Sequence, residues 1–404
     1  MTSVQGGRRR GEIAVYSLAA VGFSARLLLA WFSRGANDAA LWEQFGWQIS
    51  HFGLRSLYDS EPWFTHPPLM GAWGFLCFRI AEATWLPFPA LLKLPGVLGD
   101  FATGFLVWRI WQRRSGEAFG VPWRAWAVLL YAFNLDAILI SGFHGNTDSL
   151  CAMFCLLAFL LQAQGRPLGA GLALAASLDV KLLPVLCVPL LLLQQRRSRD
   201  ASRFAIGLLL GLVPFLYVVP SAGAMAQRML AYGGNPEHWG LLALFNLSVD
   251  LPRLGPNAAW AAEAYHRTGR YLLLAIFVGL GLLQRWRPRW TQLELGALAF
   301  SAFLVFAPGF GIQYTVYPVP FLSAINLRTA SFYGLTAGLF AATLYVAFWT
   351  GGSPWFSLFT GPYPMPVPLL GVVPWLLLLQ FFGATLERGL RRSAPPFSDA
   401  YATV

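Results

Sequence analysis

The chain has 404 residues, of which 56% are hydrophobic and 12% are charged, and its mean hydropathy is +0.54. Because soluble domains carry about 25% charged residues, this composition excludes a soluble fold and predicts an all-α integral membrane protein. The net charge of +11 does not indicate a nucleic-acid partner, since the arginines form short clusters between apolar stretches and the aromatic residues are not interleaved with a basic stripe.

Apolar segments recur along the chain at the length of about 20 residues that crosses a bilayer core of about 30 Å. They lie at residues 13–33, 91–111, 125–142, 148–164, 204–220, 271–285, 292–308, 313–327, 331–350 and 367–386. The positive-inside rule places the arginine clusters between them, and both termini, in the cytoplasm. With the hairpin described below, this predicts a single polytopic membrane domain, residues 1–404, with about twelve transmembrane helices.

Residues 34–90 follow the first span and are predicted to form a long first outer loop. The apolar stretch 67–86 within it cannot cross the membrane fully, because a full span would place Arg113 and Arg114 outside. We therefore expect an interfacial or re-entrant juxtamembrane helix there. Residues 221–270 are apolar enough for short helices that lie on the outer surface and cover a cavity. Two further outer loops are expected at 143–147 and 351–366.

The apolar stretch 167–193 contains a polar turn, Asp179-Val-Lys181. One continuous helix would place Arg166 and the arginines after the stretch on opposite faces, so two short helices that meet at this turn are predicted. Each half, about 13 residues or about 20 Å long, is too short to cross alone and must be shielded by protein or line a water-filled cavity. Charges at the tip of such a broken pair indicate a site.

The remaining ionisable residues gather at the outer ends of the predicted spans, where ionisable groups indicate function by default. They are Asp38, Glu43, His51, Asp59, Glu61, His66, His144, Asp148, Asp179 and Lys181. Asp38 directly follows the first span, so its carboxylate is a candidate general base toward an acceptor hydroxyl. The alternative role is an N-cap for a helix from Ala39 to Ile49, because Asp is a preferred cap.

The loop His144-Gly-Asn-Thr-Asp148 joins two spans on the same face as Asp38. His144 and Asn146 are candidate substrate contacts, and Asp148 is another that could instead cap the next helix. Lys181, one of only two lysines in the chain, is a candidate partner for a lipid phosphate. The alternative for Lys181 is a simple pair with Asp179.

Four further residues complete the candidate binding set. Asp100 lies near the middle of its span, where a charge costs about 2.5–3.5 kcal/mol, so it needs a partner in the bundle, and a structural role is as open as a binding role. Gln313 and Tyr314 follow a loop of glycines and a proline at the outer face and offer hydrogen bonds to a phosphate or a sugar. His66 lies in the first outer loop.

No cofactor is predicted. The four cysteines form no CxxC pair, the chain has no Walker A motif, and no Asp-x-Asp stands in a cytoplasmic loop. A nucleotide-sugar enzyme with a cytoplasmic metal site is therefore disfavoured. A divalent metal stays open but is not indicated.

Taken in order, these short motifs resemble those of the GT-C glycosyltransferases, membrane enzymes that include protein O-mannosyltransferases, arabinosyltransferases and the dolichol-pathway mannosyl- and glucosyltransferases. The resemblance covers about residues 10–330. The motifs are Asn37-Asp38, Trp47 to Tyr58, His66 to Leu69, the Asp100 span, Ser141 to Asp148, Lys181 to Pro184, and Pro308 to Tyr314.

The resemblance implies a mannosyltransferase-like enzyme that transfers a hexose or pentose, with inversion, from a polyprenyl-phosphate sugar. The active site would lie on the extracytoplasmic side of the cell membrane, and the acceptor would be lipid-linked, a glycan or a protein. Asp38 would be the base, Lys181, His144 and Gln313 would lie near the donor phosphate, and the Pro-Pro segment after His66 would be the juxtamembrane helix.

Two departures leave the subfamily and the sugar open. Asp38 lacks the adjacent acidic residue of some members, and Asn134-Leu-Asp136 stands where relatives often show Asn-Pro. Two other functions also stay open. A secondary transporter or lipid-glycan flippase would use the Asp179–Lys181 hairpin as its midplane site, although we find no inverted repeat. A glycan polymerase or ligase would rely on outer-loop arginines, here Arg228, Arg253, Arg267 and Arg270.

Overall fold

The computed structural model describes residues 2–231, 239–249, 255–351, 355–364 and 366–392, which form an almost entirely helical fold. The first half contains α1 (Thr2–Phe32), α2 (Asn37–Phe52), α3 (Leu54–Ser60), α4 (Pro68–Ala83), α5 (Phe88–Trp111), α6 (Trp123–Ala132), α7 (Leu135–Leu139), the π-helix η1 (Ile140–His144), α8 (Asp148–Ala163), α9 (Pro167–Val180), the 3₁₀-helix η2 (Leu183–Leu186) and α10 (Cys187–Leu193).

The second half continues with α11 (Ser198–Gly211), η3 (Val213–Ser221), α12 (Ala222–Ala231), α13 (Gly240–Val249), α14 (Gly255–Trp286), α15 (Gln292–Phe306), η4 (Ile312–Val316), α16 (Pro318–Ile325), α17 (Leu327–Ala347) and α18 (Val367–Arg391). Two short strand pairs complete the described fold. β2 (Glu117–Ala118) pairs antiparallel with β3 (Val121–Pro122), and β1 (Ser33–Ala36) pairs parallel with the distant β4 (Trp355–Ser357).

Four helices are long and apolar enough to cross a bilayer, namely the Arg9–Phe32 part of α1, α5, α17 and α18. Two bent helix pairs also qualify if each is one span, which gives up to six spans in the described part of the chain. The protein is therefore an all-helical, multi-pass membrane protein. The total of about twelve transmembrane helices stays a prediction.

Shorter apolar helices fill the interior of the bundle. In α15, twelve of the fifteen residues are buried, as expected for a helix that is apolar on all sides. Helices α9 and α11 approach each other backbone to backbone, because a Cβ on Gly171 or Gly207 would lie 2.1 Å from a carbonyl oxygen of the other helix. Only glycine fits at these two positions, as in other membrane helix pairs with small residues at the contact.

The break expected in the stretch 167–193 is present, and the membrane placement of the helices in the first predicted outer loop stays a prediction. Helix α9 ends at Val180, Lys181 has extended backbone, and the short η2 and α10 follow, so the stretch 167–193 is broken at the predicted turn. The first predicted loop contains α2, α3 and α4, and α4 packs mainly against α2. Helix α4 has 16 residues and is not among the candidate spans.

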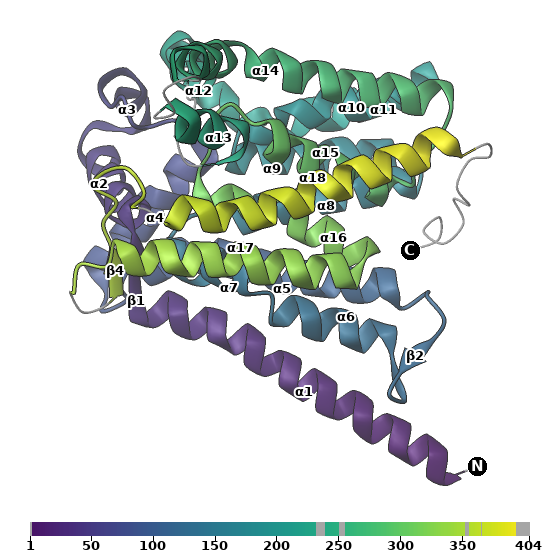
Figure 1. Cartoon of the computed structure of the whole chain (residues 1–404). Coiled ribbons are helices and arrows are strands. Elements are labelled where there is room, and N and C mark those ends of the chain that lie inside the picture. The colour runs from purple at the N-terminus through teal and green to yellow at the C-terminus, as the bar shows by residue number, and fades with distance from the viewer. Residues whose placement is uncertain (1, 232–238, 250–254, 352–354, 365, 393–404) are drawn as a thin grey trace.

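The two ends of the helix bundle differ in what they contain (Figure 1). Helices α2, α3 and α4 and the strands β1 and β4 lie at one end, on the left of the view. The N-terminal end of α1, strand β2 and the C-terminal end of α18 lie at the other. We call the first the β1–β4 end and the second the arginine-rich end, which carries Arg9, Arg10, Arg113, Arg114, Arg388, Arg391 and Arg392.

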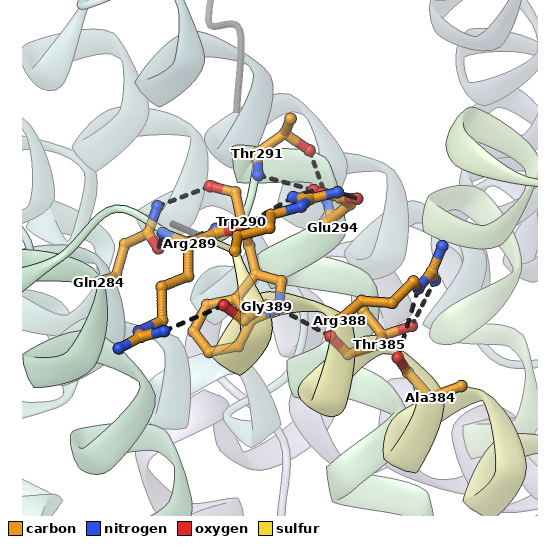
Figure 2. Close-up of polar contacts among 10 residues, drawn as sticks. Gln284, Arg289, Trp290, Thr291, Glu294, Ala384, Thr385, Arg388 and Gly389 are labelled. Carbon is orange, nitrogen blue, oxygen red and sulfur yellow. Dashed lines mark hydrogen bonds and ion pairs between the residues drawn. The ribbon is translucent and has the colours of Figure 1, made fainter. Parts of the chain in front are cut away.

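At the arginine-rich end, guanidinium groups close the C-terminal end of α18. Arg289 donates to Gly389 O at 3.1 Å (Figure 2). It also donates to Leu390 O at 2.8 Å. Arg392 binds the two carboxylate oxygens of Glu294, a member of the capping box that begins α15, at 2.9 and 3.0 Å. These contacts satisfy carbonyl groups that a helix end leaves unpaired and place positive charge at the negative end of its dipole.

Candidate active site

A cavity of about 610 Å³ lies at the β1–β4 end. One part of its wall is apolar and comes from η2 and α15, and the other part is polar. Six of the nine residues predicted to form the site line it, namely Asp38, His66, Asn146, Lys181, Gln313 and Tyr314. Further lining side chains include Trp42, Trp63, Leu182, Leu183, Leu186, His266, Arg267, Arg270 and Phe303.

The parallel pairing of β1 with β4 fixes the backbone next to Asp38. The side chain of the preceding residue, Asn37, accepts a hydrogen bond from Phe359 N at 2.7 Å and donates one to Phe359 O at 3.0 Å. Gly35 has a φ of +98°, and a Cβ there would lie 2.4 Å from Phe143 O, so only glycine fits. These contacts place Asp38 in the first turn of α2, at the wall of the cavity.

Both polar neighbours of Asp38 meet the same carboxylate oxygen. Asn146 Nδ2 donates to Oδ2 at 2.7 Å, and His144 Nε2 lies 3.4 Å from that atom. No hydrogen bond to Oδ1 is found among the described residues. The carboxylate is therefore held through one oxygen and keeps acceptor capacity on the other. The N-cap alternative for Asp38 is wrong, because Ala36 occupies the N-cap of α2.

The surroundings of Asp38 keep its carboxylate ionised. Burial raises its pKa, but the hydrogen-bond contact with His144 and the charges of His144, Lys181 and His66 outweigh this and lower the pKa from 3.8 to about 2. His66 shows the opposite preference. Burial and the nearby charge of Lys181 lower its pKa to about 3, against the opposing effect of Asp38, so the imidazole is neutral near pH 7.

Lys181 joins the hairpin turn to the start of α8. Its Nζ donates to both carboxylate oxygens of Asp148 at 2.9 Å, and the Asp148 side chain is fully buried. The same Nζ lies 4.9 Å from the centre of the Tyr314 ring, a cation–π distance. Both alternatives from the sequence are wrong here. Lys181 pairs with Asp148 rather than with Asp179, and Thr147, not Asp148, is the N-cap of α8.

Of the arginines considered for a polymerase or ligase, two line the cavity and one binds backbone elsewhere. Arg267 and Arg270 of α14 line the cavity, and Arg267 also pairs with Glu263. Arg228 binds backbone carbonyls at the end of α3, including Asp59 O at 2.9 Å. Arg253 lies outside the described residues.

Asp100 is separate from the cavity. Its carboxylate accepts hydrogen bonds from Arg26 Nε, Tyr131 Oη and Ser141 Oγ, each at 2.7 Å, and both Arg26 and Asp100 are fully buried. The expected partner within the bundle is therefore present. The contacts support a structural role, and a binding role for Asp100 stays a prediction.

Two residues of this arrangement were missed by the sequence interpretation. Arg26 could have been found, because it is an arginine inside an apolar span and so matches the charge of Asp100. Tyr345 of α17 carries no such signal. Its hydroxyl lies 2.9 Å from His144 Nδ1, although the two residues are 201 positions apart.

A helical membrane fold with a mixed polar and apolar cavity is compatible with a membrane glycosyltransferase of the GT-C type, and the family comparison shows this class. The family model of glycosyltransferase family 87 matches residues 64–308, more than half of the chain, and the chain belongs to this family. Among curated proteins, none matches the chain. The matched region contains His66, Asn146 and Lys181, whereas Asp38 and Tyr345 lie outside it.

Proposed function

We propose that this glycosyltransferase moves a hexose or pentose from a polyprenyl-phosphate donor to an acceptor hydroxyl, with inversion, and that Asp38 is the general base. The observation that carries the proposal is the geometry of Asp38, whose Oδ2 is held by Asn146 and His144 while Oδ1 is left to accept a proton at the cavity wall. Such a base contributes about 10²–10⁴-fold to the rate.

The bond changes follow from this arrangement. The acceptor oxygen forms a bond to the anomeric carbon as the bond from that carbon to the phosphate oxygen breaks, and the phosphate leaves with the electron pair. Because the hydroxyl becomes strongly acidic only as its bond to carbon forms, a carboxylate with a pKa of about 2 can take the proton late in the step. Attack opposite the leaving phosphate inverts the anomeric centre.

The cavity wall suits a lipid phosphate. Lys181 and Arg270 approach the cavity from different elements and supply positive charge for the leaving group, and Gln313 supplies hydrogen-bonding groups. Leu182, Leu183 and Leu186 in the hairpin, with Phe303, offer an apolar surface for the prenyl chain. By the positive-inside rule the arginine-rich end is cytoplasmic, so the cavity lies on the extracytoplasmic face of the cell membrane.

The test is consumption of a donor panel by the purified protein in nanodiscs. Wild type is supplied with polyprenyl-phosphate mannose, glucose and a pentose, together with a crude membrane extract as acceptor, and released polyprenyl phosphate is measured. One donor should be consumed, and NMR of the product should show an inverted anomeric centre. Consumption of none of these donors would refute the donor class and leave the transporter alternative to be tested.

A further inference from the structure

Tyr345, His144 and Asp38 form a continuous line of contacts from α17 to the cavity. The Tyr345 hydroxyl lies 2.9 Å from His144 Nδ1, and His144 Nε2 lies 3.4 Å from Asp38 Oδ2. Tyr345 is 5% exposed and the His144 side chain 3%, so solvent has almost no access to the imidazole. Among the described residues, the buried Nε2 makes no hydrogen bond, and the Asp38 carboxylate at 3.4 Å is the acidic group in contact with it.

The protonation of this line follows from the chemistry of its members. An ionised carboxylate can only accept, so the contact of Asp38 with His144 is favourable only when Nε2 carries a proton. When His144 is neutral, its imidazole has a single N–H, and with that proton on Nε2 the Nδ1 atom is an acceptor. The group next to Nδ1 must therefore donate, and the Tyr345 hydroxyl is placed to do so.

We propose that Tyr345 is a positioning residue for the base: it donates to His144 Nδ1 and so fixes the imidazole tautomer whose Nε2–H points at Asp38. The inference rests on the proposed function, because it assigns Tyr345 a role in the reaction that Asp38 is proposed to perform. Without the hydroxyl, only the 3.4 Å contact with Asp38 favours the Nε2–H tautomer, so the Nδ1–H tautomer becomes more populated. In that tautomer the Nε2 lone pair faces the carboxylate. Repulsion would turn Asp38 away from Asn146 and from the acceptor.

The surroundings of Tyr345 hold its ring in place for this role. Ser357 Oγ of β4 donates to Tyr345 O at 2.7 Å, and the Tyr345 ring stacks on Phe359 with 6.1 Å between ring centres. Phe359 also makes both hydrogen bonds to Asn37, the residue before Asp38. The segment that follows α17 thus supports the base and its positioning residue together.

The experiment is a double-mutant cycle with Tyr345→Phe and His144→Ala, measured as kcat and donor KM in nanodiscs. Tyr345→Phe keeps the ring packing and removes only the hydroxyl. We expect kcat to fall about tenfold, less than the roughly 10²–10⁴-fold contribution of the base itself, with donor KM unchanged. In the His144→Ala background, Tyr345→Phe should have no further effect, because it acts only through His144.

The matched control is Tyr333→Phe. Tyr333 is a second buried tyrosine of α17, and its hydroxyl donates to Thr315 O at 2.7 Å. This variant loses one buried hydrogen bond and should keep wild-type kcat. Thermal unfolding of all variants shows whether each one folds.

The experiment distinguishes failure of the positioning role from failure of the proposed function. If wild type turns over donor while Tyr345→Phe matches it, or lowers kcat equally with and without His144, the positioning role is refuted and the proposed function survives. A change in donor KM alone would also refute it and indicate a packing role. If wild type itself consumes no donor, the proposed function fails and this inference with it.

Discussion

The two ends of this helix bundle use ionisable side chains in opposite ways. At the arginine-rich end, guanidinium groups donate hydrogen bonds to carbonyl or carboxylate oxygens. Arg114 donates to Ala324 O at 2.9 Å, and Arg392 donates to Glu294. At the β1–β4 end, Asp38 is held through Oδ2 only. The proposed site therefore differs from the arginine-rich end in that the Asp38 carboxylate has one oxygen without a hydrogen bond from the described residues.

The pair of Arg26 and Asp100 is fully buried, and both carboxylate oxygens of Asp100 accept hydrogen bonds. Breaking this pair should have the largest effect on stability. Arg26→Met leaves the Asp100 carboxylate buried with only its two hydroxyl donors, Tyr131 and Ser141. Breaking a buried ion pair costs about 3–5 kcal/mol, so thermal unfolding in detergent should move to much lower temperature. The double variant Arg26→Met with Asp100→Asn should recover part of the loss, and no recovery would contradict the pairing.

Lys181 tests the proposed donor site at the β1–β4 end, because it lines the cavity in addition to its pair with Asp148. Lys181→Met keeps the length of the side chain and removes the charge. We expect donor KM to rise about 10–100-fold, as a lost charge-assisted contact to phosphate is worth roughly 1.5–3 kcal/mol. Arg267→Gln is the control, because Arg267 also lines the cavity but, unlike Lys181, is not among the charges that act on Asp38. A larger KM effect at Arg267 than at Lys181 would reverse the assignment.

Part of the fold and of the candidate site can be predicted from the sequence, because the apolar pattern and the positive-inside rule are enough to find it. They predict the break at Asp179-Val-Lys181 and six residues that line one cavity. Partner choice is not predictable in this way. Lys181 is two residues from Asp179 but pairs with Asp148, because the packing of α8 against α9 brings the start of α8 to the hairpin turn.

Contacts between segments far apart in the sequence could not be predicted either. The pairing of β1 with β4 joins residues more than 300 positions apart, and four-residue and three-residue strands have too little hydrophobic pattern to be recognised. The contact of Tyr345 with His144 was not predictable for the same reason, because the two residues are 201 positions apart. Nothing in α17 distinguishes Tyr345 from the other tyrosines until its distance to His144 is known.

The pH dependence of activity tests the contacts that keep Asp38 ionised, with a smaller effect than Lys181. Because its pKa is lowered from 3.8 to about 2, the base form predominates above about pH 2. The stability from its contacts is complete above pH 3.8 and is lost as pH falls from there through about 2. His144, Lys181 and His66 face this group. Wild-type kcat/KM should therefore show no acid limb from Asp38 down to about pH 4.

The His144→Ala variant sharpens that prediction. It removes the main lowering contact while burial still raises the pKa, so an acid limb should move upward into the measurable range. The comparison is between the shapes of the two profiles, so a lower overall rate in the variant does not obscure it. Superimposable profiles would show that His144 does not control the ionisation of Asp38.

The smallest effect is expected at the arginine-rich end. Arg392→Gln breaks a partly exposed pair with Glu294 whose side chains are 32% and 17% exposed. Pairs of this kind contribute about 0.2–1 kcal/mol, so unfolding temperature should fall by a few degrees at most and kcat should not change. A loss of kcat in this variant would contradict this view, because it would show that the arginine-rich end affects the reaction.

The most direct test of the central claim is Asp38→Asn, which keeps the shape of the side chain and removes its basicity. Turnover and donor binding are measured separately in nanodiscs with the donor that wild type consumes. The account predicts a fall in kcat of about 10³-fold, with donor affinity and unfolding temperature close to wild type. Turnover by Asp38→Asn at the wild-type rate would contradict the assignment of Asp38 as the base.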